Sequence, residues 1–316
     1  MQRYILRRLL LSVPTIFVVA TITFLLLNLV PGDVTLNFIA EGSGYNEQKL
    51  DEIRHDLGLD QPLPVRYAHW MTDLLRGDFG DSMLTKRSTL KTFVEHSPVT
   101  FEIGLLSIAV GALIAIPIGT MAAVKRGTPI DHISRLVASV GIAAPNFWLG
   151  TMAVVFMGLW FQYSAPPGFR SPFIDPIANV QQVFFPVAIT GFRQSALSMR
   201  LMRTAMLEVL RQDYVRTAHS KGLTSLIVVR RHALRNAIIP VVTVMGTQVG
   251  FIMGGTVIME TLFNLPGLGW LTLDSILRRD YTQVQTNVLL LSMLVVFANL
   301  VTDVLYGVID PRIRYD

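Results

Sequence analysis

Long apolar stretches alternate with short basic segments along most of this chain of 316 residues. The first apolar stretch, 9–30, is uncharged and long enough to cross a hydrocarbon core of about 30 Å. Five more follow, at 99–124, 136–160, 182–202, 238–263 and 286–309. Ala144-Pro145-Asn146 interrupts the third, because proline disfavours a helical conformation in the residue before it. The pattern predicts an all-α membrane protein with six transmembrane helices.

The distribution of basic residues predicts the orientation of these helices. Arg3, Arg7 and Arg8 precede the first stretch, and Lys125 and Arg126 follow the second. Because short cytoplasmic loops are rich in Lys and Arg, we expect both chain termini in the cytoplasm. The first stretch is longer than the apolar core of a cleavable signal peptide, so we interpret it as an uncleaved helix.

A polar segment of mixed charge, 31–98, separates the first two predicted helices. It is too long for a plain connector, and its residues 47–57 and 65–75 have helical patterns. We expect an extracytoplasmic cap, since long loops are translocated largely regardless of their charge. The predicted divisions are a first helix at 1–30, the cap at 31–98, and a core at 99–316 with a cytoplasmic coupling loop at 206–237.

A basic stretch, Glu208 to Pro240, lies between the fourth and fifth apolar stretches. Two short amphipathic helices are predicted within it. Apolar residues at helical spacing define one face of each helix, Leu207, Leu210, Tyr214 and Ala218 in the first and Leu226, Val229, Ala233 and Ala237 in the second. Gly222 is suited to end the first helix, and Thr224 or Ser225 to begin the second. A basic loop folded in this way indicates contact with a partner.

Composition supports a membrane protein and excludes several functions. The chain is 51% hydrophobic and 16% charged, whereas soluble proteins carry about a quarter charged residues. The net charge of +5 comes from basic residues that flank the apolar stretches, so it does not indicate nucleic-acid binding. Because the chain has no cysteine, disulfides and thiolate metal sites are excluded.

The sequence contains no pattern typical of an enzyme. It lacks a Gly-x-x-x-x-Gly-Lys phosphate loop, a His-Glu-x-x-His zinc motif and a Gly-x-Ser-x-Gly nucleophile turn. Its six histidines have no ligand spacing, and we expect His219 and His232 to be packing or surface residues. We therefore predict no catalytic residue, no metal site and no cofactor in this chain.

Arg193 stands near the middle of the fourth apolar stretch, beside Gln194. A charge at that depth is costly in lipid, so it should face protein or water. Two interpretations are open: Arg193 contacts a polar or anionic substrate in a translocation path, or it pairs with a carboxylate of a neighbouring helix, such as Glu102 or Glu260. If the boundary of the stretch is shifted by a turn or two, Arg193 instead reaches the membrane interface and both interpretations weaken. Both carboxylates lie nearer helix ends, where we expect them to reach water or the interface, or to pair helices. The candidate path residues are Arg193, Gln194, Glu102 and Glu260.

Several short motifs occur together in an informative order. They are Val30-Pro31-Gly32-Asp33, Leu57-Gly58-Leu59-Asp60, Gly77-Asp78-Phe79-Gly80, Asp213-Tyr214-Val215-Arg216-Thr217-Ala218, Leu265-Pro266-Gly267-Leu268-Gly269 and Arg279-Asp280-Tyr281. Each motif is weak alone. Together, over nearly the whole chain, they resemble the permease subunits of ATP-binding-cassette (ABC) importers of the peptide/nickel class, first-permease type, which includes dipeptide and oligopeptide permeases.

The resemblance implies a type I ABC importer permease fold in the cytoplasmic (inner) membrane of a bacterium or archaeon. The implied partners are a second homologous permease subunit, two ABC ATPase subunits, an extracytoplasmic solute-binding protein and membrane lipid, with no nucleic acid. ATP and magnesium would be bound by the ATPase subunits. The chain would form half of a translocation path for peptides or similar small solutes.

The resemblance also implies that the cytoplasmic loop docks into a groove of an ATPase subunit. It assigns this coupling role to Arg211, Asp213, Tyr214, Arg216, Thr217, Ala218, Lys221 and Gly222. The general loop motif of importers begins Glu-Ala-Ala, and here Arg216 and Thr217 replace its Glu and first Ala. Docking is still expected, but without a salt bridge from that Glu.

The alternative function is a stand-alone secondary transporter or channel. Such proteins often carry inverted repeats, and this chain has no convincing internal repeat. An intramembrane enzyme is disfavoured, because no nucleophile or metal constellation is present. The resemblance leaves the substrate open among peptides, glutathione, nickel chelates, opines and sugars. It also leaves open whether the outer cap is a gate or a docking platform.

Overall fold

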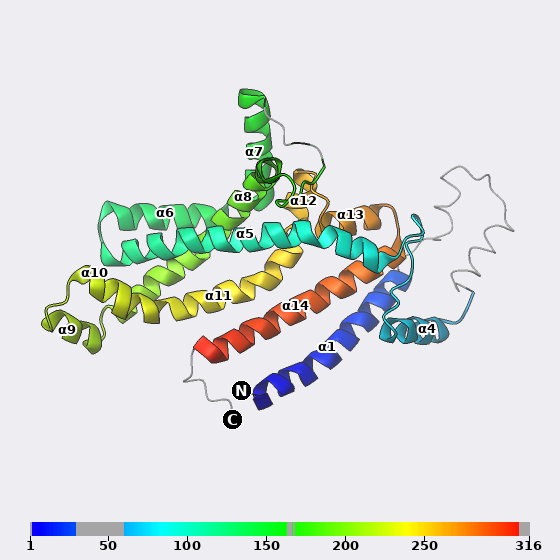
Figure 1. Ribbon diagram of the computed structural model, residues 1–316, viewed down its shortest axis with the longest axis horizontal. Coiled ribbons are helices and arrows are strands. Elements are labelled where there is room, and N and C mark those ends of the chain that lie inside the picture. Colours follow the sequence, from blue (N-terminus) through cyan, green and yellow to red (C-terminus); the bar gives the residue numbers. More distant parts are fainter. Residues whose placement is uncertain (1, 30–59, 163–165, 167, 310–316) are drawn as a thin grey trace. The chain divides into compact units, whose positions relative to one another are not determined.

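The computed structural model describes residues 2–29, 60–162, 166 and 168–309. These residues are helical apart from turns, connections and an isolated bridge between Asp81 and Ser88. In chain order, Figure 1 shows α1 (Gln2–Leu29), α4 (Leu63–Leu75), α5 (Thr89–Val124), α6 (Pro129–Ala143), α7 (Asn146–Phe161), α8 (Pro176–Val209), α9 (Asp213–Ser220), α10 (Ser225–Ile227), the π-helix η1 (Val228–Ala233), α11 (Leu234–Gly255), α12 (Val257–Leu262), α13 (Leu268–Leu277) and α14 (Tyr281–Ile309).

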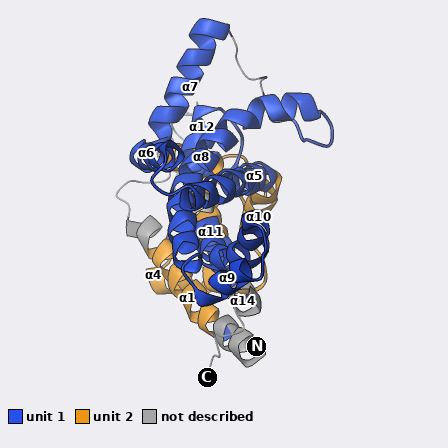
Figure 2. Cartoon of the chain, turned by 90° about the vertical axis from the view of Figure 1, so that its left-hand side faces the viewer, with its two compact units in different colours: residues 1–10, 97–270, 294–316 blue, residues 11–96, 271–293 orange. Residues whose placement is uncertain are grey.

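The chain divides into two compact units, which Figure 2 colours separately. The first unit contains residues 1–10, 97–270 and 294–316. The second contains residues 11–96 and 271–293. The basic loop and Arg193 both belong to the first unit, so the candidate functional residues lie there.

Helix α8 is the central helix of the first unit. Gly111 of α5 lies against Gly191 of α8, and Gly141 of α6 lies against Ala196 of α8. Small residues such as these let helices approach closely in a membrane, where burying apolar side chains gives little driving force. A buried apolar cluster then joins α8 to η1 and α11 through Met202, Met206, Ala233, Ala237 and Val241.

The third apolar stretch breaks where the sequence predicts. Helix α6 ends at Ala143 and α7 begins at Asn146, and the two helices are bent by 97°. Ala144 is extended, with a ψ angle of 123°, because a proline follows it. Figure 1 shows α7 turning away from the direction of α6.

Two helices within the described residues are long and apolar enough to cross a membrane, at 89–124 and 281–302. The bent pair α6 and α7 raises the number to three if it counts as one span. Helix α8 has 34 residues, which is longer than the predicted 182–202, but it is more polar than either span. Six spans with cytoplasmic termini therefore stay a prediction.

In the second unit, α4 packs against α1 through aromatic side chains. The Phe24 ring centroid lies 5.3 Å from that of Tyr67 and 5.4 Å from that of Trp70. This confirms the predicted helix at 65–75, and the helix predicted at 47–57 lies outside the described residues. Aromatic pairs at these distances add to the stability that burial alone gives.

The second unit also joins two of the short sequence motifs. Asp280, directly before α14, accepts hydrogen bonds from the Ser82 hydroxyl and, at 3.1 Å, from the Met83 N–H. Gly80 lies against Thr282, with little room for a side chain. The segment after Gly80 is therefore fastened to the first turn of α14.

Candidate functional site

The basic loop folds around a small apolar core of its own. Val215 and Ala218 of α9 are buried against Val228 of η1. The predicted helix that continues from Leu207 past Leu210 is wrong, because α8 ends at Val209 and a turn at 210–212 precedes α9. This turn is needed for α9 to fold back and bury its apolar face on η1 (Figure 1).

The second predicted loop helix exists, but it is not separate from the fifth apolar stretch. Helices α10, η1 and α11 follow one another without a turn between them. Thr224 stands at the N-cap position of α10, as predicted, but its side chain makes no capping hydrogen bond. Short π-helical segments are frequent at functional sites. The loop is thus continuous with α11.

A hydrogen bond ties α9 directly to α11. Asn236 Nδ2 donates to Tyr214 Oη over 2.8 Å and also to the His232 carbonyl oxygen over 3.2 Å. Together with the packing of Val215 and Ala218 on η1, this bond holds α9 to the helix that continues into α11. A displacement of α9 is therefore expected to move α11 as well, because packed residues and not a flexible linker connect the two helices.

Most of the predicted coupling residues are exposed. They are Arg211, Asp213, Tyr214, Arg216, Thr217, Lys221 and Gly222. Ala218 differs, because its side chain is 6% exposed and belongs to the loop core, where it positions α9. Arg216 and Asp213 form an ion pair at 3.5 Å, but both side chains are exposed, so the pair contributes little stability.

Gly222 ends α9 in the left-handed conformation, with φ at +78°, as the sequence predicts. A Cβ atom added there would meet nothing within 4 Å, so the backbone angle alone disfavours other residues. Gly127, in the turn between α5 and α6, has φ at +79° and is equally open. The two glycines therefore provide a matched pair for experiments.

Arg193 is exposed on α8, at the level of the apolar middle of α5. Gly111 of α5 lies near the Gly191 carbonyl oxygen and the Ser195 nitrogen, which bracket Arg193 along the axis of α8. Helix α5 is uncharged from 103 to 124. At 1.5 Å per residue, Gly111 lies about 12 Å from one end of this uncharged segment and about 20 Å from the other.

Within the described part of the chain, no ion pair joins Arg193 to Glu102, Glu260 or another carboxylate. Glu102 is half-buried and lies next to Asn179, whose Nδ2 donates to the Arg170 carbonyl oxygen. Gln194 is buried, with its side chain toward α5, and its Oε1 atom has no hydrogen-bond partner among the residues that the structure describes. An arginine at the bilayer centre costs about 2.5–3.5 kcal/mol on insertion scales, so Arg193 should face protein or water.

Glu260 is fully buried, so it does not reach water and instead pairs helices, the other role expected of it. Thr100 Oγ1 donates to Glu260 Oε1 at 2.7 Å, and the Trp270 N–H donates to Oε2 at 2.9 Å. The Leu268 N–H in turn donates to Thr100 Oγ1 at 2.8 Å. Gly267 lies so close to the carboxylate that a Cβ atom would not fit. The carboxylate thus fastens the first turn of α13 to α5.

An ion pair that the sequence analysis missed joins α6 to α8. Asp131, in the first turn of α6 and ahead of the predicted span, accepts from Arg203 Nε at 2.7 Å and Nη2 at 2.9 Å. It also accepts from the Gly127 N–H at 2.9 Å. The Arg203 guanidinium, assisted by Gly127, holds the pKa of Asp131 well below its usual range. The sequence does signal a helix start here, because proline is common at the first helical position and acidic residues are favoured in the first turn. It does not reveal the partner, because Arg203 is distant in the sequence.

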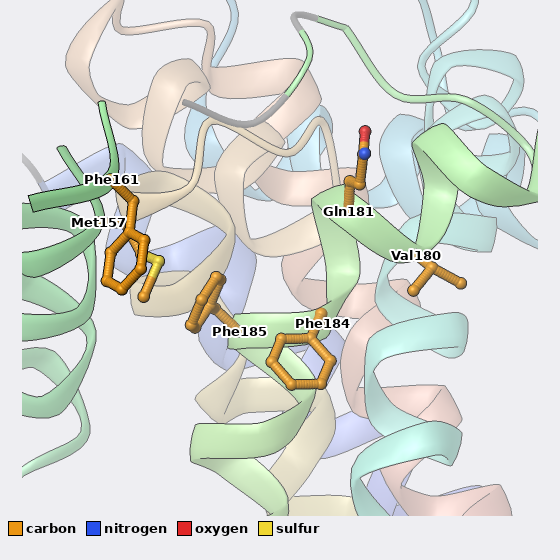
Figure 3. Close-up of a pocket in the computed structure, with 6 residues that line it drawn as sticks. All are labelled: Met157, Phe161, Val180, Gln181, Phe184 and Phe185. Atoms are coloured by element: carbon orange, nitrogen blue, oxygen red, sulfur yellow. The ribbon is translucent and has the colours of Figure 1, made fainter. Parts of the chain in front are cut away.

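An open groove of about 430 Å³ lies between α7 and α8 (Figure 3). Its lining is apolar except for Gln181, whose amide points away from the phenyl rings in this view. The rings of Phe184 and Phe185 meet edge to face, with centroids 5.2 Å apart. Because the lining offers no acid, base or nucleophile, this groove supports no catalytic chemistry.

Comparison with known families identifies the chain. Residues 115–315 match the family described as "Binding-protein-dependent transport system inner membrane component". Residues 1–104 match the N-terminal part of such membrane components. The chain belongs to the binding-protein-dependent importer permeases.

Permeases with similar sequences align over the whole chain. The dipeptide transport system permease protein DppB of Escherichia coli K12 is 36% identical, with 100% of this chain and 99% of DppB covered. The di/tripeptide transport system permease protein DppB of Pseudomonas aeruginosa is 38% identical at the same coverage. A putative peptide transport system permease of Brucella abortus is 37% identical over 100% of both chains. The resemblance to peptide-class importer permeases is confirmed.

A solved structure supports the fold of this permease. An inward-facing structure of the methionine ABC transporter MetNI contains a chain that superposes with a TM-score of 0.54 at 18% identity. The match covers 70% of the permease and 97% of that chain. The type I ABC importer permease fold is therefore confirmed, while the number of spans is not. As an inner-membrane permease component, the protein is not the catalytic subunit, and ATPase and solute-binding partners follow from the family.

Proposed function

We propose that this permease forms half of the translocation path of an ATP-driven importer of peptides, together with a second homologous permease. In this proposal it has six spans with both termini in the cytoplasm. Two ATPase subunits hold ATP and magnesium, and the solute-binding protein delivers cargo to the outer cap. The dipeptide and di/tripeptide permeases that align over the full chain support peptides as the substrate class.

The observation that carries the proposal is the attachment of α9 to α11. The exposed side of α9 offers a surface for an ATPase groove, while its buried side and the Tyr214–Asn236 hydrogen bond hold it to α11. Closure of the ATPase pair on ATP would displace α9. Because the linkage is short and packed, α11 would move with it and change access to the path.

Arg193, Gln194, Glu102 and Glu260 have different roles in this proposal. Arg193 borders the path, because it is exposed at membrane depth and lipid would not accept its charge. Gln194 and Glu102 are turned into helix contacts and line the path only if α8 moves relative to α5. Glu260 is fully buried and serves to position α13.

The coupling role is tested by substituting Gly222 with Trp in the assembled transporter. The variant should insert and assemble but lose ATP-driven peptide uptake, because a bulky residue with an unfavourable φ disrupts the end of α9. Gly127→Trp is the matched control, since it carries the same backbone strain in a different turn. Normal uptake by Gly222→Trp, or equal losses in both variants, would contradict the coupling role of α9.

A stand-alone secondary transporter is separated from the importer by its energy source. In proteoliposomes that contain only this chain, an ion gradient would drive uptake if the protein worked alone. The importer requires the ATPase subunits, the second permease and ATP. Gradient-driven uptake by the isolated chain would overturn the proposed function.

A further inference from the structure

We propose that Arg193 binds a carboxylate of the passing cargo and thereby makes the path selective for carboxylate-bearing solutes. This inference rests on the proposed function, in which α8 borders the path. It goes further in assigning a ligand group to a particular side chain. The ligand chemistry is a carboxylate, such as the C-terminus of a peptide.

The depth of Arg193 excludes simple contact with water at the membrane surface. Arg193 lies at the depth of Gly111, because Gly111 of α5 contacts α8 on both sides of Arg193. Gly111 is about 12 Å from the nearer end of the uncharged segment of α5. Even an extended arginine side chain is shorter than that distance. A water-filled or cargo-filled space beside α8 is therefore needed to solvate the guanidinium.

The exposed side of α8 carries two arginines with no acidic residue of the helix between them. Arg193, Leu197, Arg200 and Thr204 are all exposed and follow helical spacing. Arg200 lies seven residues after Arg193, about 10 Å farther along the axis and about 20° around the helix. Between them the exposed side has no Asp or Glu. An anion that moves from Arg193 toward the C-terminal end of α8 therefore meets a second guanidinium, that of Arg200.

Guanidinium and carboxylate fit each other chemically. The planar guanidinium donates two parallel hydrogen bonds to a carboxylate, and these are stronger than bonds between neutral groups. A free carboxylate that leaves bulk water for a narrow path also needs a new partner, because burying an ionised group without one is costly. Arg193 supplies this partner at one point, and Arg200 provides the next.

The experiment uses single cysteine variants, because the natural chain contains no cysteine. Arg193→Cys is reconstituted with its ATPases, second permease and binding protein, and treated with cationic aminoethyl or anionic sulfonatoethyl methanethiosulfonate. Ser195→Cys is the control, since Ser195 lies at the same depth but is fully buried. ATP-driven uptake of labelled dialanine is measured before and after treatment, with Arg193→Gln and Arg193→Lys in parallel.

We expect the thiol of the Arg193→Cys variant to react about tenfold faster than the thiol of the Ser195→Cys variant, because only the exposed side of α8 meets water. Arg193→Cys and Arg193→Gln should lower dialanine uptake about tenfold or more, the loss expected for a hydrogen bond between charged groups. The cationic adduct and Arg193→Lys should restore most of the uptake, whereas the anionic adduct should not.

Four results would overturn the inference. One is a thiol in the Arg193→Cys variant that reacts no faster than the thiol in the Ser195→Cys variant. Another is equal uptake with either adduct, and a third is normal uptake by Arg193→Gln. Loss of the second permease from Arg193→Gln preparations would instead assign Arg193 to a subunit interface and also overturn it. If the unsubstituted transporter shows no ATP-driven dialanine uptake, the proposed peptide function fails, separately from the role of Arg193.

Discussion

Replacing Thr100 with Val tests the hydrogen-bond cluster around Glu260. Valine has nearly the shape of threonine but no hydroxyl. The Thr100 hydroxyl donates to Glu260 Oε1 at 2.7 Å and accepts from the Leu268 N–H at 2.8 Å. Both partners lose a hydrogen bond in the variant, and Glu260 and Thr100 are each 0% exposed, so water does not replace the hydroxyl.

The expected loss follows from the two buried hydrogen bonds that the substitution removes. A buried polar group that loses its hydrogen bond costs about 1–3 kcal/mol, and more if it is charged. Two such groups give about 2–6 kcal/mol for Thr100→Val. Thr100→Ser keeps the hydroxyl and removes only a methyl group, which costs about 1 kcal/mol. The two variants therefore separate the hydrogen bonds from the packing.

The assay is the unfolding midpoint of the purified transporter in mild detergent, with increasing sodium dodecyl sulfate, for wild type and both variants. Thr100→Val should unfold at a clearly lower midpoint than Thr100→Ser. A Val variant as stable as the Ser variant would refute the reasoning, because the hydroxyl would then contribute nothing to holding α13 on α5.

Three further predictions concern contacts in the first unit. Asp131→Asn should lower stability by about 2 kcal/mol, less than for a fully buried pair because the Arg203 side chain is 20% exposed. Because the pKa of Asp131 is lowered in the folded protein, this stabilisation is complete above about pH 3.9, the pKa of an unperturbed Asp. It is lost as the pH falls through the folded pKa. The unfolding midpoints of wild type and variant should therefore differ at neutral pH and converge only in acid. Gly119→Leu should prevent assembly, because even a Cβ atom would lie 2.7 Å from Met202 on α8, and size-exclusion chromatography would detect this. Tyr214→Phe should lower uptake per ATP hydrolysed while leaving the complex assembled, since it removes only the bond to Asn236; unchanged coupling would show that this bond transmits nothing.

Local signals in the sequence predicted several features correctly. The break at Ala144-Pro145-Asn146 follows from proline chemistry, and the end of α9 follows from the conformational freedom of Gly222. Both depend on residues adjacent in the chain. The helix predicted from Leu207 through the loop failed, because the break at 210–212 is required by packing of α9 on η1, which periodicity does not reveal.

The polar residues were harder to predict, because their partners are distant in sequence. Glu260 was expected to reach water or the interface or to pair helices; it is fully buried and pairs with Thr100, which lies 160 residues away in the sequence. Asp131 was not singled out at all, although Arg203 makes it the centre of a buried ion pair. Arg193 was selected as a candidate path residue only because it lies near the middle of an apolar stretch. The structure adds that its side chain is exposed and that α8 packs on α5 at the same depth.

The most direct test of the account is isolation of the tagged permease from its native membrane in mild detergent, followed by mass spectrometry and an ATPase assay. The account predicts two ATPase chains and a second permease in the same complex, with ATP hydrolysis stimulated by the loaded binding protein. Recovery of a lone chain that neither binds ATPases nor responds to ATP would contradict the account, and a transporter that works alone would then be the better explanation.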